Sequence, residues 1–255
     1  MATYDWATEA FIGRNSAGTA GAVPGSAAAD APAPAPADGE PQGPAAVFVA
    51  FDLETTGLDP KKERIVEIGA VKFDRRGPIG RFSVLINPGI PMPAEASKIN
   101  GITDAMLAGK PSLDEVLPDF IRFIAGAALV AHNAPFDCSF VDASLAERWE
   151  KARKAKAEDP AQGSLLAADA GASEAPAEKF WTPPFGALPN RVVDTRIYAK
   201  EAFPNRWKYN LQDLAKFLGV NALEAHRAED DARVCMEVFI KCAEKSAGME
   251  VPTFG

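Results

Sequence analysis

A regular hydrophobic pattern begins at Val47, after a stretch with few large apolar residues. Three segments with the length and apolar content of β-strands then follow one another at 47–53, 64–74 and 80–88, joined by short turns. Successive strands with short connections predict an antiparallel meander. The first part of the folded chain is therefore expected to be a three-stranded sheet.

Downstream of the meander, the pattern predicts alternating strands and helices. In the segment 113–126, apolar residues recur at helical spacing, with Ser112 and Glu115 placed as a capping box and Gly126 at the predicted end. The other predicted elements are strands at 128–132 and 191–194 and helices over about 136–149, from Thr195, after the N-cap Asn210 and over about 228–245. A meander followed by parallel strand–helix units predicts an α/β fold, a mixed five-stranded sheet flanked by helices.

Two segments lack this pattern and define the expected domain organisation. Residues 1–46 include an Ala/Pro/Gly-rich stretch that buries too little apolar surface to become ordered, which predicts a disordered tail. Its first residues, "YDWATEAFIG", are either a short docking peptide on that tether or a disordered terminus with a few aromatic residues. Residues 47–248 form the predicted domain, with an insertion at about 150–188 that is too long for an ordinary loop and is expected to be mobile.

Composition limits the class of protein. The 255 residues carry a formal net charge of −8, which argues against strong non-specific binding to DNA but not against an enzyme that acts on nucleic acid. Three cysteines are too few to suggest a disulfide framework and favour a reducing, cytoplasmic compartment. No apolar run approaches the length of a membrane span, so no membrane association is expected.

The first candidate chemistry lies in the stretch "VFVAFDLETTG", where a strand pattern contains two acids. Asp52 and Glu54 are two residues apart, so their side chains should project from the same face of the strand. Two like charges held that close repel each other, and removing either one from water costs free energy. Such a pair is expected only where a cation or a chemical role compensates for this cost.

Two further acids occur in similar settings, each five residues after a histidine. Asp137 follows His132 at the end of a predicted strand, and Asp231 follows His226 near the start of the last predicted helix. Either aspartate alone is explained as a residue at a helix N-terminus. Together with the first pair, however, they provide four carboxylates at the ends of apolar elements. Hard carboxylate oxygens are the ligands of Mg²⁺ and Mn²⁺, so we expect a site for two such cations.

The same residues carry a resemblance to a known family. "FDLETTGLDPKKERIVEIGAVKF", "INPGIPMPAEASKINGITDAML", "VAHNAPFD", "VVDTRIYA" and "HRAEDDA" resemble, in this order, the motifs of the DnaQ-like DEDDh 3′–5′ exonucleases. This family includes the proofreading epsilon subunit of bacterial replicative polymerases. The resemblance covers roughly residues 47–245 apart from the insertion, and it implies a ribonuclease H-like fold.

The resemblance also implies roles for individual residues. Asp52, Glu54, Asp137 and Asp231 match the four metal-binding acids, and His226 matches the histidine that acts as general base. The implied reaction is hydrolysis of the terminal phosphodiester with two Mg²⁺ or Mn²⁺ ions, releasing 5′-nucleoside monophosphates. His132 is expected to organise the strand end. The residues that match positions near the terminal nucleotide are Thr55, Thr56, Ile99, Asn100 and Asn133. Many relatives have histidine where this chain has Asn100.

Three hypotheses about function follow. The first is a 3′–5′ exonuclease acting on 3′ ends of DNA, single-stranded or mismatched, as in proofreading or repair. The second is an exoribonuclease that trims small RNAs or oligoribonucleotides, because no motif reveals contacts to a 2′-hydroxyl. The third is an inactive module that only binds nucleic acid, although all five residues of the catalytic set are present. A polymerase or clamp partner would dock on the aromatic N-terminal peptide.

Overall fold

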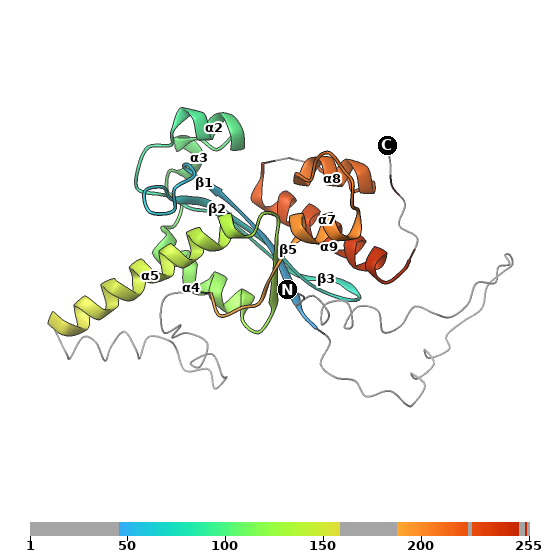
Figure 1. Ribbon diagram of the computed structural model, residues 1–255. Coiled ribbons are helices and arrows are strands. Elements are labelled where there is room, and N and C mark those ends of the chain that lie inside the picture. The colour runs from blue at the N-terminus through green and yellow to red at the C-terminus, as the bar shows by residue number, and fades with distance from the viewer. Residues whose placement is uncertain (1–45, 159–187, 224–225, 250–252, 254–255) are drawn as a thin grey trace, which may run out of the picture.

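A mixed five-stranded sheet with the order β3-β2-β1-β4-β5 forms the centre of the fold (Figure 1). The computed structural model describes residues 46–158, 188–223, 226–249 and 253. Strands β1 (Phe48–Thr55), β2 (Ile65–Asp74) and β3 (Gly77–Leu85) form an antiparallel meander, and β4 (Ala128–Ala131) and β5 (Val192–Asp194) extend it in parallel. The predicted fold class is confirmed.

Helices cover both faces of this sheet (Figure 1). Helices α4 (Leu113–Ile124) and α5 (Pro135–Glu158) pack on one face, and α7 (Thr195–Ala202), α8 (Leu211–Leu218) and α9 (Ala228–Ser246) cover the other. Each face has its own hydrophobic cluster. In β1, Phe48 and Ala50 belong to the cluster with α9, whereas Val49, Phe51 and Leu53 belong to the cluster with α4 and α5. This alternation sets the direction of every side chain on the central strand.

Most of the predicted helix boundaries are confirmed by their capping residues. Ser112 and Glu115 form the capping box that starts α4, and Asn210 Oδ1 accepts a hydrogen bond from the Asp213 amide at the start of α8 (2.9 Å). Helix α4 ends at Ile124, two residues before Gly126, which has φ +73°. Pro118 lies within α4.

Two short helices were not predicted. Helices α2 (Ala94–Asn100) and α3 (Asp104–Leu107) follow the meander and pack on a small separate cluster that includes Val66, Met92 and Ile102. Helices of seven and four residues are too short to repeat a helical hydrophobic pattern, and their only buried apolar residues, Ala96 and Leu107, belong to this cluster.

Strand β3 was predicted about three residues too late. It begins at Gly77 directly opposite Asp74, because Arg75 and Arg76 form a tight turn in which the Asp74 carboxylate accepts a hydrogen bond from the Arg76 amide (2.8 Å). Gly77 has φ +124°, a conformation that side chains rarely adopt. In the sequence, Arg75, Arg76, Gly77 and Pro78 suggested a loop. In the structure, the backbone of Gly77 and Pro78 already pairs with β2.

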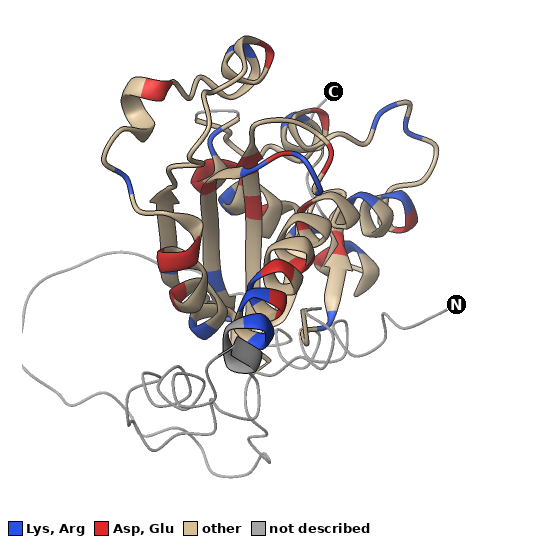
Figure 2. Ribbon diagram, turned by 90° about the vertical axis from the view of Figure 1, so that its left-hand side faces the viewer, with Lys and Arg blue, Asp and Glu red and all other residues tan. Residues whose placement is uncertain are grey.

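The helix predicted over about 136–149 is longer than expected, because α5 continues to Glu158. Between residues 147 and 154 this helix carries charged side chains of both signs (Figure 2). Lys151 pairs with Glu147 at 3.0 Å and Arg153 with Glu150 at 2.9 Å, which stabilises an exposed stretch of the helix. Lys151 also lies 3.6 Å from Asp114 of α4. The predicted tail up to residue 45 and the aromatic residues Phe180, Trp181 and Phe185 lie outside the described residues.

Candidate active site

Asp52 and Glu54 lie on the face of β1 that α9 covers. They share the alternation of Phe48 and Ala50, whose side chains pack with α9, so both carboxylates project toward the start of that helix. In the antiparallel register, Asp52 lies opposite Gly69 and Glu54 opposite Glu67. The expectation that the two acids share one face is confirmed.

Asp137 reaches the same region from the other side of β1. Strand β4 runs parallel to β1, so the loop after β4 and the start of α5 lie beside the end of β1. The buried Asp137 side chain accepts a hydrogen bond from the Leu53 amide through Oδ1 (3.1 Å). This bond links the third acid to the backbone between Asp52 and Glu54.

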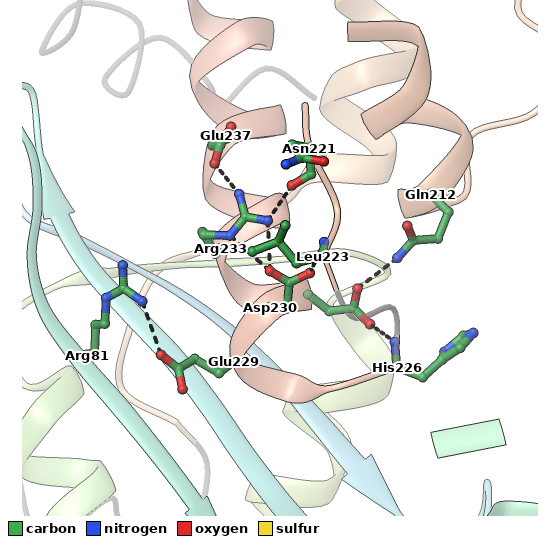
Figure 3. Close-up of polar contacts among 10 residues, drawn as sticks. Arg81, Gln212, Asn221, Leu223, His226, Glu229, Asp230, Arg233 and Glu237 are labelled. Carbon is green, nitrogen blue, oxygen red and sulfur yellow. Dashed lines mark hydrogen bonds and ion pairs between the residues drawn. The ribbon is translucent and has the colours of Figure 1, made fainter. Parts of the chain in front are cut away.

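Asp231 and His226 come from the start of α9. Asp231 accepts hydrogen bonds on both oxygens, from the His226 amide (2.9 Å) and from Nε2 of Gln212 on α8 (2.8 Å; Figure 3). His226 is exposed and has φ +65°, a left-handed conformation uncommon for residues other than glycine. A ligand atom of His226, one of Glu54 and one of Asp231 all lie within 4.8 Å of one another. These three side chains could hold one cation.

The four carboxylates are in an unfavourable electrostatic environment. Burial, followed by the charge of Asp137, raises the pKa of Asp52 well above its ordinary value, and burial raises the pKa of Glu54 to about 8. Burial also raises the pKa of Asp137 to about 8, although the bond from Leu53 lowers it in part. The pKa of Asp231 is raised by burial as well.

This arrangement fits a site for hard divalent cations. Buried carboxylates that raise one another's pKa lose that penalty when a cation neutralises them. Asp52, Glu54, Asp137 and Asp231 offer carboxylate oxygens, the type of ligand that Mg²⁺ and Mn²⁺ prefer. These side chains therefore support a site for divalent cations.

The same pKa values predict how the stability of the metal-free protein depends on pH. A carboxyl whose folded pKa is raised stabilises the fold below its unfolded pKa and loses that contribution as the pH rises through the folded value. Burial lowers the pKa of His132 from 6.5 to about 4. This shift makes the free energy of unfolding rise with pH, but only below pH 6.5. Between pH 6.5 and 8, the raised pKa values of Asp52, Glu54 and Asp137 therefore determine most of the pH dependence among the groups with shifted pKa.

We expect the free energy of unfolding in EDTA to fall by on the order of 2–4 kcal/mol between these two pH values. Urea denaturation at several pH values measures this. Mg²⁺ should remove most of the slope, because it keeps the carboxylates ionised and compensated. An equal slope with and without Mg²⁺ would contradict the metal site.

A buried bracket, formed by Glu67, Gly69 and Arg227, holds the start of α9 against β2. The Glu67 carboxylate accepts hydrogen bonds from the Arg227 guanidinium (2.9 and 3.3 Å) and from the Ala228 amide (3.2 Å). A Cβ added to Gly69 would lie 2.0 Å from the Ala228 carbonyl carbon. Only a glycine lets α9 approach the strand this closely, and the bracket thereby positions His226 and Asp231.

Sequence reasoning missed this bracket. Glu67 and Gly69 lie within the strand pattern "IVEIGAVKF" and resemble ordinary strand residues. Two signals were available, namely a charged residue in an apolar run and an isolated glycine in a strand, which often marks a close backbone approach. Gln212, which contacts Asp231, carried no comparable signal.

The residues expected near the terminal nucleotide differ in their contacts and in their exposure. The Thr55 hydroxyl donates to the Gly57 carbonyl (2.6 Å), and the Thr56 hydroxyl donates to Glu63 (2.6 Å). Asn100 is buried, and its side chain bonds the Ile102 amide (3.0 Å) and the Thr55 carbonyl (3.4 Å). Ile99, in contrast, is 63 % exposed, so its apolar side chain is available for contact with a base or sugar.

His132 organises the strand end. Its Nδ1 lies 2.9 Å from the Thr195 hydroxyl and its Nε2 lies 2.9 Å from the Tyr209 carbonyl, so both ring nitrogens are engaged. Asn133 has φ +65° and its amide donates to Asp194 (3.2 Å), which also caps α7. The expectation of a structural role for His132 is confirmed.

Comparison with known proteins assigns the family. A family model described as "Exonuclease" matches residues 49–159 and 162–239. The chain therefore belongs to this exonuclease family, and it is an enzyme of the exonuclease class. The resemblance to DnaQ-like 3′–5′ exonucleases is thereby confirmed.

Individual relatives agree with this assignment. The DNA polymerase III subunit epsilon of Treponema pallidum is 45 % identical over 194 residues, covering 75 % of this chain and 74 % of that protein. The PolC-type DNA polymerase III of Caldanaerobacter subterraneus is 35 % identical over 198 residues, but the chain spans only 12 % of its length. Among solved structures, exonuclease X in complex with 5′ overhanging duplex DNA has the same fold, with a TM-score of 0.54, 23 % identity and coverage of 80 % of this chain and 95 % of that one.

Across the part of the chain that the structure describes, no helix is both long and apolar enough to cross a membrane.

Proposed function

We propose that this exonuclease removes 5′-nucleoside monophosphates one at a time from the 3′ end of DNA, with Mg²⁺ or Mn²⁺ held by Asp52, Glu54, Asp137 and Asp231. The observation that carries the proposal is the convergence of three chain segments, β1, the start of α5 and the start of α9, on one group of carboxylates. Three of its members, Glu54, Asp137 and Asp231, are buried, and all three act electrostatically on Asp52. The epsilon-subunit and exonuclease X relatives support DNA as the substrate.

Different groups have different roles in the proposed reaction. When bound, the cations lower the pKa of the attacking water and stabilise the departing 3′ oxygen. His226 accepts the proton of that water, since a solvent-exposed imidazole can act as a general base at neutral pH. Its place within 4.8 Å of Glu54 and Asp231 puts the base beside the ion site. Ile99 and Asn133 contact the terminal nucleotide.

The proposed nuclease unit comprises residues 47–248. The name of the Treponema relative suggests that the protein works beside a replicative polymerase. The N-terminal peptide proposed to dock on such a partner lies outside the described residues.

A labelled-oligonucleotide assay tests the proposed function. DNA of about 20 nucleotides, labelled at its 5′ end, is expected to shorten stepwise from its 3′ end with Mg²⁺ and to stay intact in EDTA. Matching RNA should be degraded more slowly. Intact DNA after incubation with folded, Mg²⁺-loaded protein would refute the proposal. Faster degradation of RNA than of DNA would instead favour the exoribonuclease hypothesis.

His226→Gln tests the base separately from the metal site. We expect kcat to fall by about 10²–10⁴-fold, because proton transfer from water is abolished, while Mg²⁺ still raises the melting temperature as in the wild type. Lys245→Ala, on the exposed last turn of α9, is the control. If His226→Gln instead abolished the Mg²⁺ effect on melting, the histidine would be a ligand rather than the base.

A further inference from the structure

An open hollow of about 600 Å³ lies next to the active site, between the start of α7 and the segment that leads into α8. Both helices lie on the side of the sheet that carries α9 (Figure 1). Of its residues, only His132 and Asn133 belong to the site described above. The hollow is lined by His132, Asn133, Arg196, Lys200, Arg206, Trp207, Lys208, Tyr209 and Asn210.

The lining of the hollow is strongly basic in a chain whose net charge is −8. It contributes Arg196, Lys200, Arg206 and Lys208, and no acid is among the lining residues that the structure describes. Two acids contact residues of the lining. Asp194 accepts hydrogen bonds from the Asn133 and Arg196 amides (3.2 and 2.9 Å), and the Asp213 carboxylate lies 3.8 Å from Lys208 in an exposed pair that contributes little. A positive surface at this place matches a polyanion.

An aromatic side chain projects from the same surface. Trp207 is 96 % exposed, although tryptophan normally buries most of its large surface. The backbone around it is nevertheless held in place, because the Tyr209 hydroxyl donates to the Phe203 carbonyl (2.7 Å) and accepts from the Arg206 amide (3.1 Å). Arg206 also lies 3.6 Å over the Phe217 ring. The indole is thus presented to solvent by a fixed segment.

The hollow lies beside the active site, because the segment that lines it continues into α8, where Gln212 contacts Asp231. The carbonyl of Tyr209 contacts His132 Nε2 (2.9 Å), and Arg196 donates to the Asn133 side chain (3.3 Å). Gln212 follows the hollow in sequence and contacts Asp231. Gln212 thus joins the segment that lines the hollow to one of the four acids.

We propose that this hollow binds the single-stranded DNA immediately 5′ of the terminal nucleotide. A base stacks on Trp207, while Lys200 and Lys208 contact backbone phosphates. Stacking on an aromatic residue combined with phosphate contacts is the usual means of holding a single strand without reading its sequence. This inference rests on the proposed function, because it assigns a site for the rest of the same substrate.

Trp207→Ala and the double variant Lys200→Ala/Lys208→Ala test the proposal. The substrates are an oligothymidylate of about 20 nucleotides and the p-nitrophenyl ester of thymidine 5′-monophosphate, which reaches only the catalytic residues. Trp149→Ala and Lys245→Ala are the matched controls, since Trp149 on α5 is also exposed (43 %) and Lys245 lies at the far end of α9.

We expect Trp207→Ala to raise KM for the oligonucleotide about tenfold and to leave hydrolysis of the ester unchanged. The double variant should reduce the slope of log Kd against log salt by about 1.4, because each phosphate that a lysine no longer neutralises lowers the slope by about 0.7. If the wild type cleaves DNA but KM and the salt slope are unchanged in both variants, the proposal is overturned. The exposed Trp207 side chain would then be a candidate contact for a protein partner.

Failure of the proposed function gives a different result. If the wild type cleaves no DNA, binding of labelled oligothymidylate is measured in EDTA by fluorescence anisotropy. Weaker binding by Trp207→Ala than by Trp149→Ala would still support the hollow as a single-strand site. Equal binding by the two variants would overturn it.

Discussion

Replacing Asp52 by asparagine is expected to reduce exonuclease activity by about 1,000-fold or more and at the same time to stabilise the metal-free protein. The loss of activity follows because the metal site supplies several kcal/mol of transition-state stabilisation, and each 1.36 kcal/mol corresponds to about a factor of ten in rate. Asparagine has nearly the same shape as the acid but cannot neutralise a cation.

The gain in stability has a separate physical cause. Burial, with the charges of Asp137, Glu54 and Asp231, raises the pKa of Asp52 well above its ordinary value. At about pH 8 without metal, the folded wild type must either bury this charge or keep a proton that the unfolded chain releases, and both cost free energy. The asparagine variant avoids both costs.

Thermal unfolding in EDTA and in Mg²⁺ measures the two effects together. We expect the variant to melt several degrees above the wild type in EDTA, since about 1 kcal/mol shifts Tm by roughly 2–4 °C in a domain of this size. Mg²⁺ should raise the Tm of the wild type far more than that of the variant. The control Asp59→Asn changes an exposed acid in the turn after β1 and should leave activity and Tm unchanged. A less stable Asp52→Asn protein in EDTA would contradict the electrostatic account.

Gly69→Ala is expected to have the second large effect, a decrease of at least about 3 kcal/mol in the free energy of unfolding together with a strong decrease in activity. The new Cβ would lie 2.0 Å from the Ala228 carbonyl carbon and 2.2 Å from the Glu229 amide nitrogen, and both are backbone atoms. Backbone cannot rotate away as a flexible side chain can, so α9 must move off β2. His226 and Asp231 move with it.

Gly80→Ala on β3 is the matched control, because its Cβ would meet only the Phe123 ring at 3.4 Å and the Lys72 side chain at 3.6 Å. Circular dichroism during thermal unfolding should show a large decrease in stability for Gly69→Ala and little change for Gly80→Ala. Exonuclease assays well below the Tm then separate misplacement of the site from unfolding. Wild-type stability and activity in Gly69→Ala would show that α9 does not depend on this close approach.

Sequence alone determined the types and order of most elements and predicted the catalytic set that the proposed function uses. The continuous apolar run of β1, the capping box at Ser112 and the cap at Asn210 are local signals, so they can be read without knowing what the segments pack against. The five motifs identified the family for the same reason, since each is a short run of residues.

Only the tertiary structure decided how the parts meet. Arg227 and Glu67 are 160 residues apart and touch only because α9 lies across β2, and the role of Gly69 depends on the same packing. The basic hollow likewise brings Asn133 beside Arg196 and Tyr209 beside His132, from segments that are far apart in the chain. Such contacts arise from the packing of whole elements, which local hydrophobic periods do not specify.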